Sequence, residues 1–315
     1  MINFRFHVVS IVAVFLALAI GVVFGSTIVD RAVVDRLEKR LDDVDEKAEQ
    51  QRDENEQLKT DIERHDAYLR SNAPYTVDGR MSGRDIVVLA DAAVSDAAIG
   101  DFQTLAVAAG GEDIVVLRVD DDVLRGEADA IKAIAERLEL SSEDVGVVQR
   151  ALWDAIAVRL AGEPRGPDEI DAPADLLGDL ADIGSITVSV IGDDTDEVLD
   201  QLGGGDTIMA IAASTSTNTE SETWFAAAAG AANERSLTTV VGEFHDPSEQ
   251  IDRGVALGEL RNGDLASEVS TVDNLDEFQG VVSLVLAAEQ LTTGVVGHYG
   301  LGAGATRSTP EFATE

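Results

Sequence analysis

The longest uninterrupted apolar segment of the chain lies at its N-terminus. Residues 8–29 run for 22 positions without a charged side chain. As an α-helix this run rises about 33 Å, enough to cross the roughly 30 Å hydrocarbon layer of a bilayer with some tilt. A cleaved signal peptide is the alternative, but its apolar region is usually about 7–15 residues long and ends in an A-x-A-like site, which this run lacks. The pattern therefore predicts a transmembrane helix over residues 8–29 that contacts the lipid bilayer.

A second pattern, with a period of seven, occupies residues 34–69. Apolar residues recur in alternating steps of three and four, and the positions between them are almost wholly charged or amide side chains. This spacing predicts a coiled-coil stalk over residues 30–70, although a lone amphipathic helix lying on the following domain has the same period. Asn55 falls on a core position and favours a parallel homodimer, because two buried amides satisfy one another in register. The predicted dimerisation residues are Leu37, Leu41, Val44, Asn55, Leu58, Ile62 and Leu69.

Beyond the stalk, short apolar runs alternate with longer segments of helical pattern. Pro74, Gly79 and Gly83 predict a linker over residues 71–83. Runs without polar alternation are typical of strands covered on both faces, so we expect an α/β head over residues 84–300 with a doubly wound, mostly parallel sheet. The expected strands are 85–90, 114–119, 186–191, 207–212 and 238–241. The expected helices are 92–109, 128–138, 143–161, 194–202, 220–233 and 275–293.

Three local signals refine the head. Asn274, with Glu277 three residues later, forms a capping-box pattern at the start of the last helix. Prolines and glycines between Gly162 and Pro173 predict a loop that divides the head as an insertion within one domain. The Gly-rich, polar segment 301–315 is expected to be a flexible tail.

Charge and cysteine usage limit the partners. Sixty Asp and Glu against 23 Lys and Arg leave a formal net charge of −37, which excludes nucleic acid and anionic headgroups as good partners. A hydrated, soluble surface explains this acidity as well as cation attraction does. The chain has no cysteine, so disulfides, thiolate nucleophiles and thiolate metal sites are excluded. Arg5 and His7 favour a cytoplasmic N-terminus over residues 1–7 and an exported head.

Candidate chemistry in the head is sparse. The glycines at 203–205 precede a strand, so they predict a turn and not a phosphate-binding loop. Residues 214–219, rich in Ser and Thr, follow a strand and precede a helix, where they either line a ligand site or cap the helix. His245 and His298 are the candidate metal ligands, and no zinc-protease or G-x-S-x-G motif accompanies them. We therefore expect no catalytic residues and no resident cofactor.

Three stretches resemble one known family. They are residues 1–7 (MINFRFH) running into 9–21 (VSIVAVFLALAIG), residues 270–274 (STVDN) and residues 297–300 (GHYG). With this layout the chain is similar to the actinobacterial copper transporter family over nearly its whole length. The resemblance implies a cell-envelope protein that acts in copper efflux as a pore across the outer membrane, with copper as its cargo.

The residues themselves support two further function classes. Cu(I) prefers Cys and Met ligands, yet the chain has no Cys and three widely separated Met, and one membrane helix cannot enclose a channel by itself. The second class is a non-enzymatic, dimeric envelope scaffold or regulator that links a membrane or cytoplasmic partner to cell-wall or division proteins. The third is an α/β ligand-binding domain or enzyme. Copper bound directly is expected at His245 and His298, since imidazole suits Cu(II).

Overall fold

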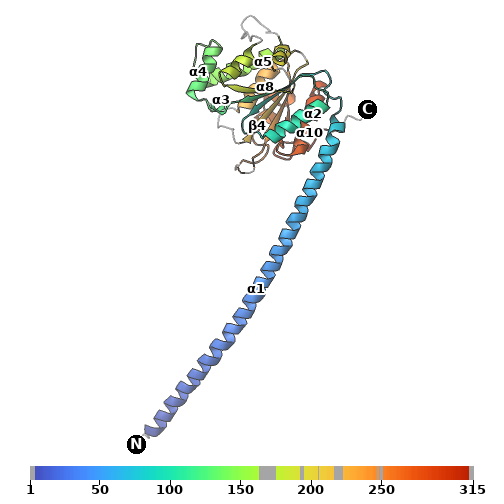
Figure 1. Ribbon diagram of the computed structural model, residues 1–315. Helices are drawn as coiled ribbons and strands as arrows, with labels where there is room; N and C mark the ends of the chain where they lie inside the picture. The colour runs from blue at the N-terminus through green and yellow to red at the C-terminus, as the bar shows by residue number, and fades with distance from the viewer. Residues whose placement is uncertain are drawn as a thin grey trace. The chain divides into compact units, whose positions relative to one another are not determined.

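One helix, α1, contains both the predicted membrane segment and the predicted stalk. In the computed structural model α1 extends over Phe4–Val77 (Figure 1). The structure describes residues 4–162, 175–191, 195–204, 206–215, 223–246, 248 and 251–311, apart from the side chains of 26–33. The chain divides into two compact units, Met1–Asp66 and Ala67–Glu315.

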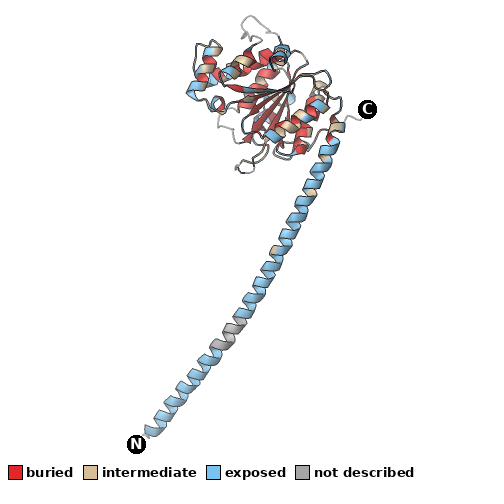
Figure 2. Ribbon diagram, viewed as in Figure 1, coloured by how far each residue is buried: buried red, intermediate tan, exposed pale blue. Residues whose placement is uncertain are grey.

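The first unit carries the candidate membrane span. Within the described residues, Phe4–Gly25 is the one helical segment of 22 residues that is long and apolar enough to cross a bilayer. Its side chains are exposed along the whole segment (Figure 2), which suits a surface that faces lipid. This span begins four residues before the predicted one, and the last positions of the predicted run 8–29 lie among the side chains that are not described.

The last turns of α1 belong to the second unit. Arg70 lies over the Phe278 ring, 4.3 Å from its centroid, and forms an ion pair with Asp101. The predicted helix break at residue 71 is therefore wrong, because α1 continues through Pro74. Burial of the apolar face of this turn outweighs the one backbone hydrogen bond that Pro74 cannot donate. Four residues of this region pack into the head core: Leu69, Ala73 and Val77 of α1, and Met81 in the turn that follows.

A mostly parallel sheet forms the centre of the second unit. In the described part of the chain its strands run in the order β3-β2-β1-β4-β5-β6-β7, and only β2 and β3 are antiparallel. The five predicted strands are confirmed, while β6 and β7 were not predicted. The bounds are β1 Ile86–Asp91, β2 Ile114–Val119, β3 Ile186–Val190, β4 Ile208–Ser214, β5 Thr238–Phe244, β6 Ser270–Val272 and β7 His298–Tyr299.

Helices cover both faces of this sheet, as a doubly wound fold requires. Val87 and Leu89 face one core cluster together with α4, α5, α6 and α8, whereas Ile86 and Val88 face the other with α2, α10 and the end of α1. This alternation is the two-residue period of a strand. Every residue of β1 and β4 is buried, which explains their unbroken apolar runs. The helices are α2 Asp96–Ala108, α3 Asp121–Arg125, α4 Ala128–Arg137, α5 Val145–Ala161, α6 Leu176–Asp182, α7 Thr195–Gln201, α8 Trp224–Glu234, α9 Gly258–Asn262, η2 Asp264–Ser267 and α10 Phe278–Thr292.

The last helix begins later than its sequence pattern predicts. The N-cap of α10 is Glu277, whose side chain makes no capping bond within the described structure. Asn274, the predicted cap, is fully buried, and its side-chain nitrogen and oxygen find no hydrogen-bond partner among the described residues. A Cβ built on Gly280 would lie 1.9 Å from the Asn274 carbonyl oxygen. Close packing of α10 against the exit of β6, and not a capping box, therefore determines this end of the helix.

The C-terminal segment packs against the head, contrary to the predicted flexible tail. The Thr306 N–H donates to the His298 carbonyl oxygen (2.8 Å), and the Gly300 N–H donates to the Arg307 carbonyl oxygen (2.9 Å). Pro310 is buried. The tail therefore lies along β7 at the end of the sheet. Residues 312–315 and most of the predicted loop between Gly162 and Pro173 lie outside the described residues.

We predict opposite effects for two glycine substitutions in helices. Gly280→Ala forces a methyl group against the Asn274 carbonyl and should destabilise the head by about 1–3 kcal/mol. Gly100→Ala in α2 meets no other described atom within 4 Å and should stabilise it by about 0.5–1 kcal/mol, because alanine is the better helix former. Chemical denaturation measures both, and a Gly280→Ala chain as stable as the parent would contradict the packing of α10.

Candidate functional site

The topological switch point of the sheet is occupied by a side chain of the protein. β1 lies between β2 and β4, where the strand order reverses, and such sheets bind ligands outside the carboxyl ends of these strands. Here the fully buried Asp91 accepts hydrogen bonds from the N–H groups of Ala93 (2.9 Å), Val94 (3.1 Å) and Ser214 (2.5 Å). The amides that would meet a ligand anion are therefore bound to a carboxylate of the chain itself.

Only the first part of the predicted ligand stretch 214–219 can be placed, because residues 216–219 lie outside the described residues. Thr215 Oγ1 accepts a hydrogen bond from the Asp246 N–H (3.1 Å), so this hydroxyl joins the ends of β4 and β5. The predicted turn before β4 is present at Gly203 and Gly204, whose φ angles are 111° and 139°.

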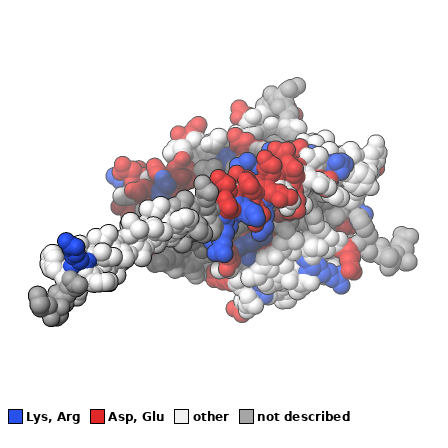
Figure 3. Space-filling view, turned by 90° about the horizontal axis from the view of Figure 1, so that it is seen from below, with Lys and Arg blue, Asp and Glu red and all other residues white. Residues whose placement is uncertain are grey.

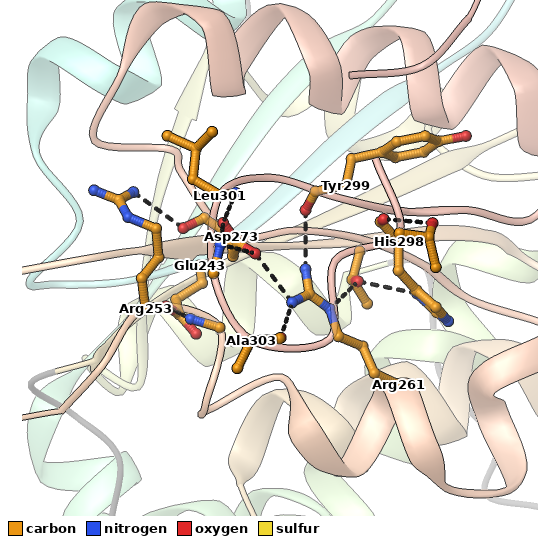
Figure 4. Close-up of polar contacts among 12 residues, drawn as sticks. Glu243, Arg253, Arg261, Asp273, His298, Tyr299, Leu301 and Ala303 are labelled. Carbon is orange, nitrogen blue, oxygen red and sulfur yellow. Dashed lines mark hydrogen bonds and ion pairs between the residues drawn. The ribbon is translucent and has the colours of Figure 1, made fainter. Parts of the chain in front are cut away.

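A second polar centre gathers the two C-terminal sequence stretches. Strand β6 lies in STVDN and strand β7 in GHYG, and the two strands pair in parallel. Polar side chains from five segments meet at this pair (Figure 4). We call the following set the β6–β7 cluster: Glu243 of β5, Arg253, Arg261 of α9, Asp273 and His298.

A buried ion pair holds the β6–β7 cluster together. Arg261 Nη1 lies 3.0 Å from Asp273 Oδ2, and the two side chains are 1% and 0% exposed. The guanidinium also donates to Thr271 Oγ1 (2.9 Å) and to the carbonyl oxygens of Tyr299 (2.9 Å) and Ala303 (2.5 Å). Removing either partner would leave a buried, unpaired charge, which typically costs about 3–5 kcal/mol. The pair therefore fixes α9, both short strands and the tail to one another.

The glycines of GHYG make room for two side chains of this region. A Cβ on Gly300, whose φ is 127°, would lie 2.1 Å from Asp273 Oδ1. That carboxylate accepts hydrogen bonds from two backbone N–H groups of the tail, at 2.7 and 3.1 Å. A Cβ on Gly297 would lie 2.1 Å from Tyr299 Oη. The motif is thus explained by close approach of the Asp273 carboxylate and of the Tyr299 ring.

His298 belongs to the same network. Its Nδ1 lies 3.0 Å from Thr271 Oγ1, and a backbone hydrogen bond joins the ring to Ala266. Burial lowers the pKa of His298 and the Arg261 guanidinium lowers it further, against the opposing effect of the Ala266 bond. The imidazole is therefore neutral at pH 7, but the same guanidinium opposes a metal cation beside the ring.

The two predicted metal residues are not gathered into a ligand set. His245 follows β5, and its Nδ1 is buried with no hydrogen-bond partner in the described structure. The neighbouring Asp246 carboxylate accepts a hydrogen bond from the Ser248 N–H (2.8 Å). Across the described ranges no group of three or more His, Asp or Glu side chains is arranged to hold a metal ion. Copper binding at His245 and His298 therefore stays a prediction.

Glu243 is placed to exchange a proton near neutral pH. Its side chain is 1% exposed, Oε1 accepts a hydrogen bond from the Gly254 N–H (2.7 Å), and Oε2 has no partner among the described residues. Burial raises the pKa of Glu243 from 4.5 to about 7; the Gly254 bond lowers it and the Asp273 carboxylate raises it, while Arg261 and Arg253 lower it. A buried carboxyl of this kind carries a proton for part of the physiological range.

Arg253 links the cluster to the start of α10. Its Nη1 and Nη2 lie 2.6 and 2.8 Å from the two Asp276 carboxylate oxygens, and Nη1 also donates to the Asp273 carbonyl oxygen (3.1 Å). Sequence reasoning singled out Asp273 and His298 through the STVDN and GHYG stretches but missed Glu243, Arg253 and Arg261. The sequence offered little signal for them: Glu243 lies two residues beyond the apolar run 238–241, and Arg253 and Arg261 belong to none of the recognised stretches.

We predict that Glu243 makes the stability of the head depend on pH. Because its folded-state pKa is raised, its contribution is fully present below pH 4.5 and is lost as the pH rises through about 7. The loss should approach about 3 kcal/mol between pH 5 and pH 8. Glu243→Gln cannot ionise and should lose this part of the dependence. Denaturation midpoints at both pH values measure the difference, and identical profiles for variant and parent would refute it.

Comparison with known proteins covers almost the entire chain. The family whose sequence model matches residues 1–310 is described as "Copper transport outer membrane protein, MctB". Similar relatives include the copper transporters MctB of Mycobacterium bovis (strain ATCC BAA-935 / AF2122/97) and Mycobacterium tuberculosis (strain ATCC 25618 / H37Rv). Each is 26% identical over 323 residues, covering 98% of this chain and 99% of the relative. The resemblance drawn from the N-terminal, STVDN and GHYG stretches is confirmed, and the chain belongs to the MctB family of copper transport proteins.

Proposed function

We propose that this chain serves the copper-related function of its family as a membrane-anchored, parallel dimer whose α/β head contacts other envelope proteins. Copper is the cargo of that process and, in this proposal, is not a ligand of the head. The observation that supports the proposal best is a row of exposed apolar side chains on α1.

These side chains recur at the spacing of a coiled-coil seam. Leu37, Leu41, Val44, Leu58 and Ile62 are between 53% and 63% exposed. Each CH₂ group that a second copy removed from water would contribute about 0.8 kcal/mol. No other described segment of the first unit covers this row of apolar side chains, so we propose that a second copy of the chain does.

Polar and terminal positions of the seam refine its geometry. Asn55 is exposed on α1, and a paired asparagine at this position favours parallel strands in register. Leu69 differs from the other predicted dimerisation residues, because it packs partly against the head core. The proposed seam therefore extends from Leu37 to about Ile62.

The seam predicts a dimer that one charge disrupts. In detergent micelles the full-length chain should sediment as a dimer, and Leu58→Asp should shift it to monomer because a buried, unpaired carboxylate is strongly disfavoured. Gln57→Asp adds the same charge one position away from the seam and should leave the dimer intact. A monomeric parent chain at high concentration, or equal loss in both variants, would contradict the proposed stalk.

We propose that the N-terminus is cytoplasmic and that the head is exported. Arg5 at the start of the apolar helix supports this orientation. The chain has no cysteine, so single introduced cysteines report topology cleanly. In intact cells Asn262→Cys should react with a membrane-impermeant maleimide while Asn3→Cys should stay unlabelled. The reverse pattern would place the head in the cytoplasm.

The contacts of the head support binding rather than catalysis. Asp91 takes up the amides of the switch point, and Arg261 and Asp273 satisfy one another in the β6–β7 cluster. Both arrangements support a rigid, non-enzymatic domain that presents a surface to a partner. Envelope proteins recovered stably with the full-length chain would agree with this role, and turnover of a small molecule by the purified chain would contradict it.

We predict that the purified chain binds copper weakly. Arg261 opposes a cation at His298, and His245 has no neighbouring ligand set, so Cu(II) or Cu(I) should bind no more tightly than to a generic acidic protein. Changing both His245 and His298 to Ala should alter binding little. Calorimetry that detects a stoichiometric site of submicromolar affinity, lost in the double variant, would restore direct copper handling.

Passage of copper through an oligomeric pore is the second candidate. The family description as a copper transport outer membrane protein favours it. With a single apolar span among the described residues, several copies would have to enclose the path. Proteoliposomes separate the two candidates: copper entry that requires the chain supports a pore, and its absence supports the scaffold.

A further inference from the structure

A cavity of about 490 Å³ lies between the C-terminal end of α10, β7 and the tail. This volume is within the range of small-molecule sites, about 300–1,000 Å³. Figure 4 shows the Tyr299 ring pointing away from the β6–β7 cluster, although its carbonyl oxygen accepts from Arg261. The polar residues that line the cavity are Arg80, Glu289, Gln290, Thr293, Tyr299, Arg307 and Glu311.

One wall of the cavity is held in place by hydrogen bonds that begin in GHYG. Gly297 leaves room for the Tyr299 ring, whose hydroxyl donates to Gln290 Oε1 (2.7 Å). Gln290 Nε2 then donates to the Glu311 carbonyl oxygen (2.5 Å). The stretch GHYG therefore fixes a polar wall that lies outside the β6–β7 cluster. This wall has no part in the proposed stalk or membrane anchor.

Two ion pairs line the same cavity. Arg80 Nη1 lies 3.4 Å from Glu289 Oε2, and Arg307 Nη1 lies 2.6 Å from Glu311 Oε2. All four side chains remain partly exposed, at 25% to 71%. Exposed ion pairs contribute only about 0–1 kcal/mol. A ligand that carries both charges can therefore exchange with these pairs at little cost to the fold.

We propose that this cavity binds a short zwitterionic peptide. The guanidinium groups of Arg80 and Arg307 meet its carboxylate, and the Glu289 and Glu311 carboxylates meet its ammonium group. The Tyr299 hydroxyl oxygen can accept a hydrogen bond from a peptide N–H, and Gln290 Nε2 can donate its second proton to a peptide carbonyl. The apolar part of the lining, Leu286, Val295 and Pro310, accommodates small aliphatic side chains. This binding function goes beyond the dimeric anchor proposed above and does not depend on it.

The test uses the full-length chain in detergent micelles with trialanine as the probe. Calorimetry and ligand-observed NMR should show saturable binding of trialanine. The dianion glutarate and N-acetyl-trialanine amide, which lack one or both of the required charges, should bind at least tenfold more weakly. No saturable binding of trialanine, or glutarate binding as tightly, would overturn the proposal.

Variants locate the site. Arg80→Gln combined with Arg307→Gln should weaken trialanine binding at least tenfold, and Glu289→Gln alone should weaken it several-fold. Lys132→Gln removes a comparable surface pair with Glu136 on α4 and should leave binding unchanged. Thermal melts establish that each variant is folded. Unchanged affinity in the folded Arg80/Arg307 double variant or in Glu289→Gln would place the peptide elsewhere and overturn the assignment.

Discussion

The ion pair between Arg261 and Asp273 determines how the chain is arranged after β5. Strands β6 and β7 have only three and two residues, so their own ladder bonds cannot hold them in place. Arg261 supplies what is missing, since one guanidinium reaches the β6 side of the sheet, a β7 carbonyl and a tail carbonyl. Buried ion pairs seldom add much net stability compared with an apolar core. Here the pair instead selects one arrangement of short segments that apolar packing alone would leave undetermined.

Periodicity in the sequence predicts the parts of the fold that are long enough to show a period. The runs that became β1 and β4 are buried on both faces, so an unbroken apolar pattern was sufficient to find them. Strands of two or three residues carry no period, which is why β6 and β7 were missed. The tail was expected to be flexible from its composition, yet its backbone N–H groups are bound by Asp273. Asn274 looked like a cap, but α10 approaches it too closely at Gly280.

The candidate functional residues divide in the same way, into those that lie in a recognisable local pattern and those that do not. Motif resemblance led to Asp273, His298 and Tyr299, because these lie inside short, recognisable stretches. Their partners Glu243, Arg253 and Arg261 come from other segments and meet them only after folding, so no local pattern marks them. The local electric field at a residue also cannot be predicted from the linear sequence. A net charge of −37 attracts cations over the surface as a whole, whereas the buried guanidinium beside His298 produces a local field of the opposite sign.

The packing of the last α1 turns against the head limits how this protein can be divided. Ala73 and Val77 are part of the head core, and they are supplied by α1, the helix that also contains the apolar N-terminal segment. A domain excised at residue 84, where the sequence pattern predicts the head to begin, would lose part of its own interior, whereas one excised before Ala67 keeps it. A recombination event that replaced the N-terminal helix would preserve the head only if the crossover lay on the N-terminal side of Ala67. In this chain the modular unit therefore includes the final turns of the N-terminal helix.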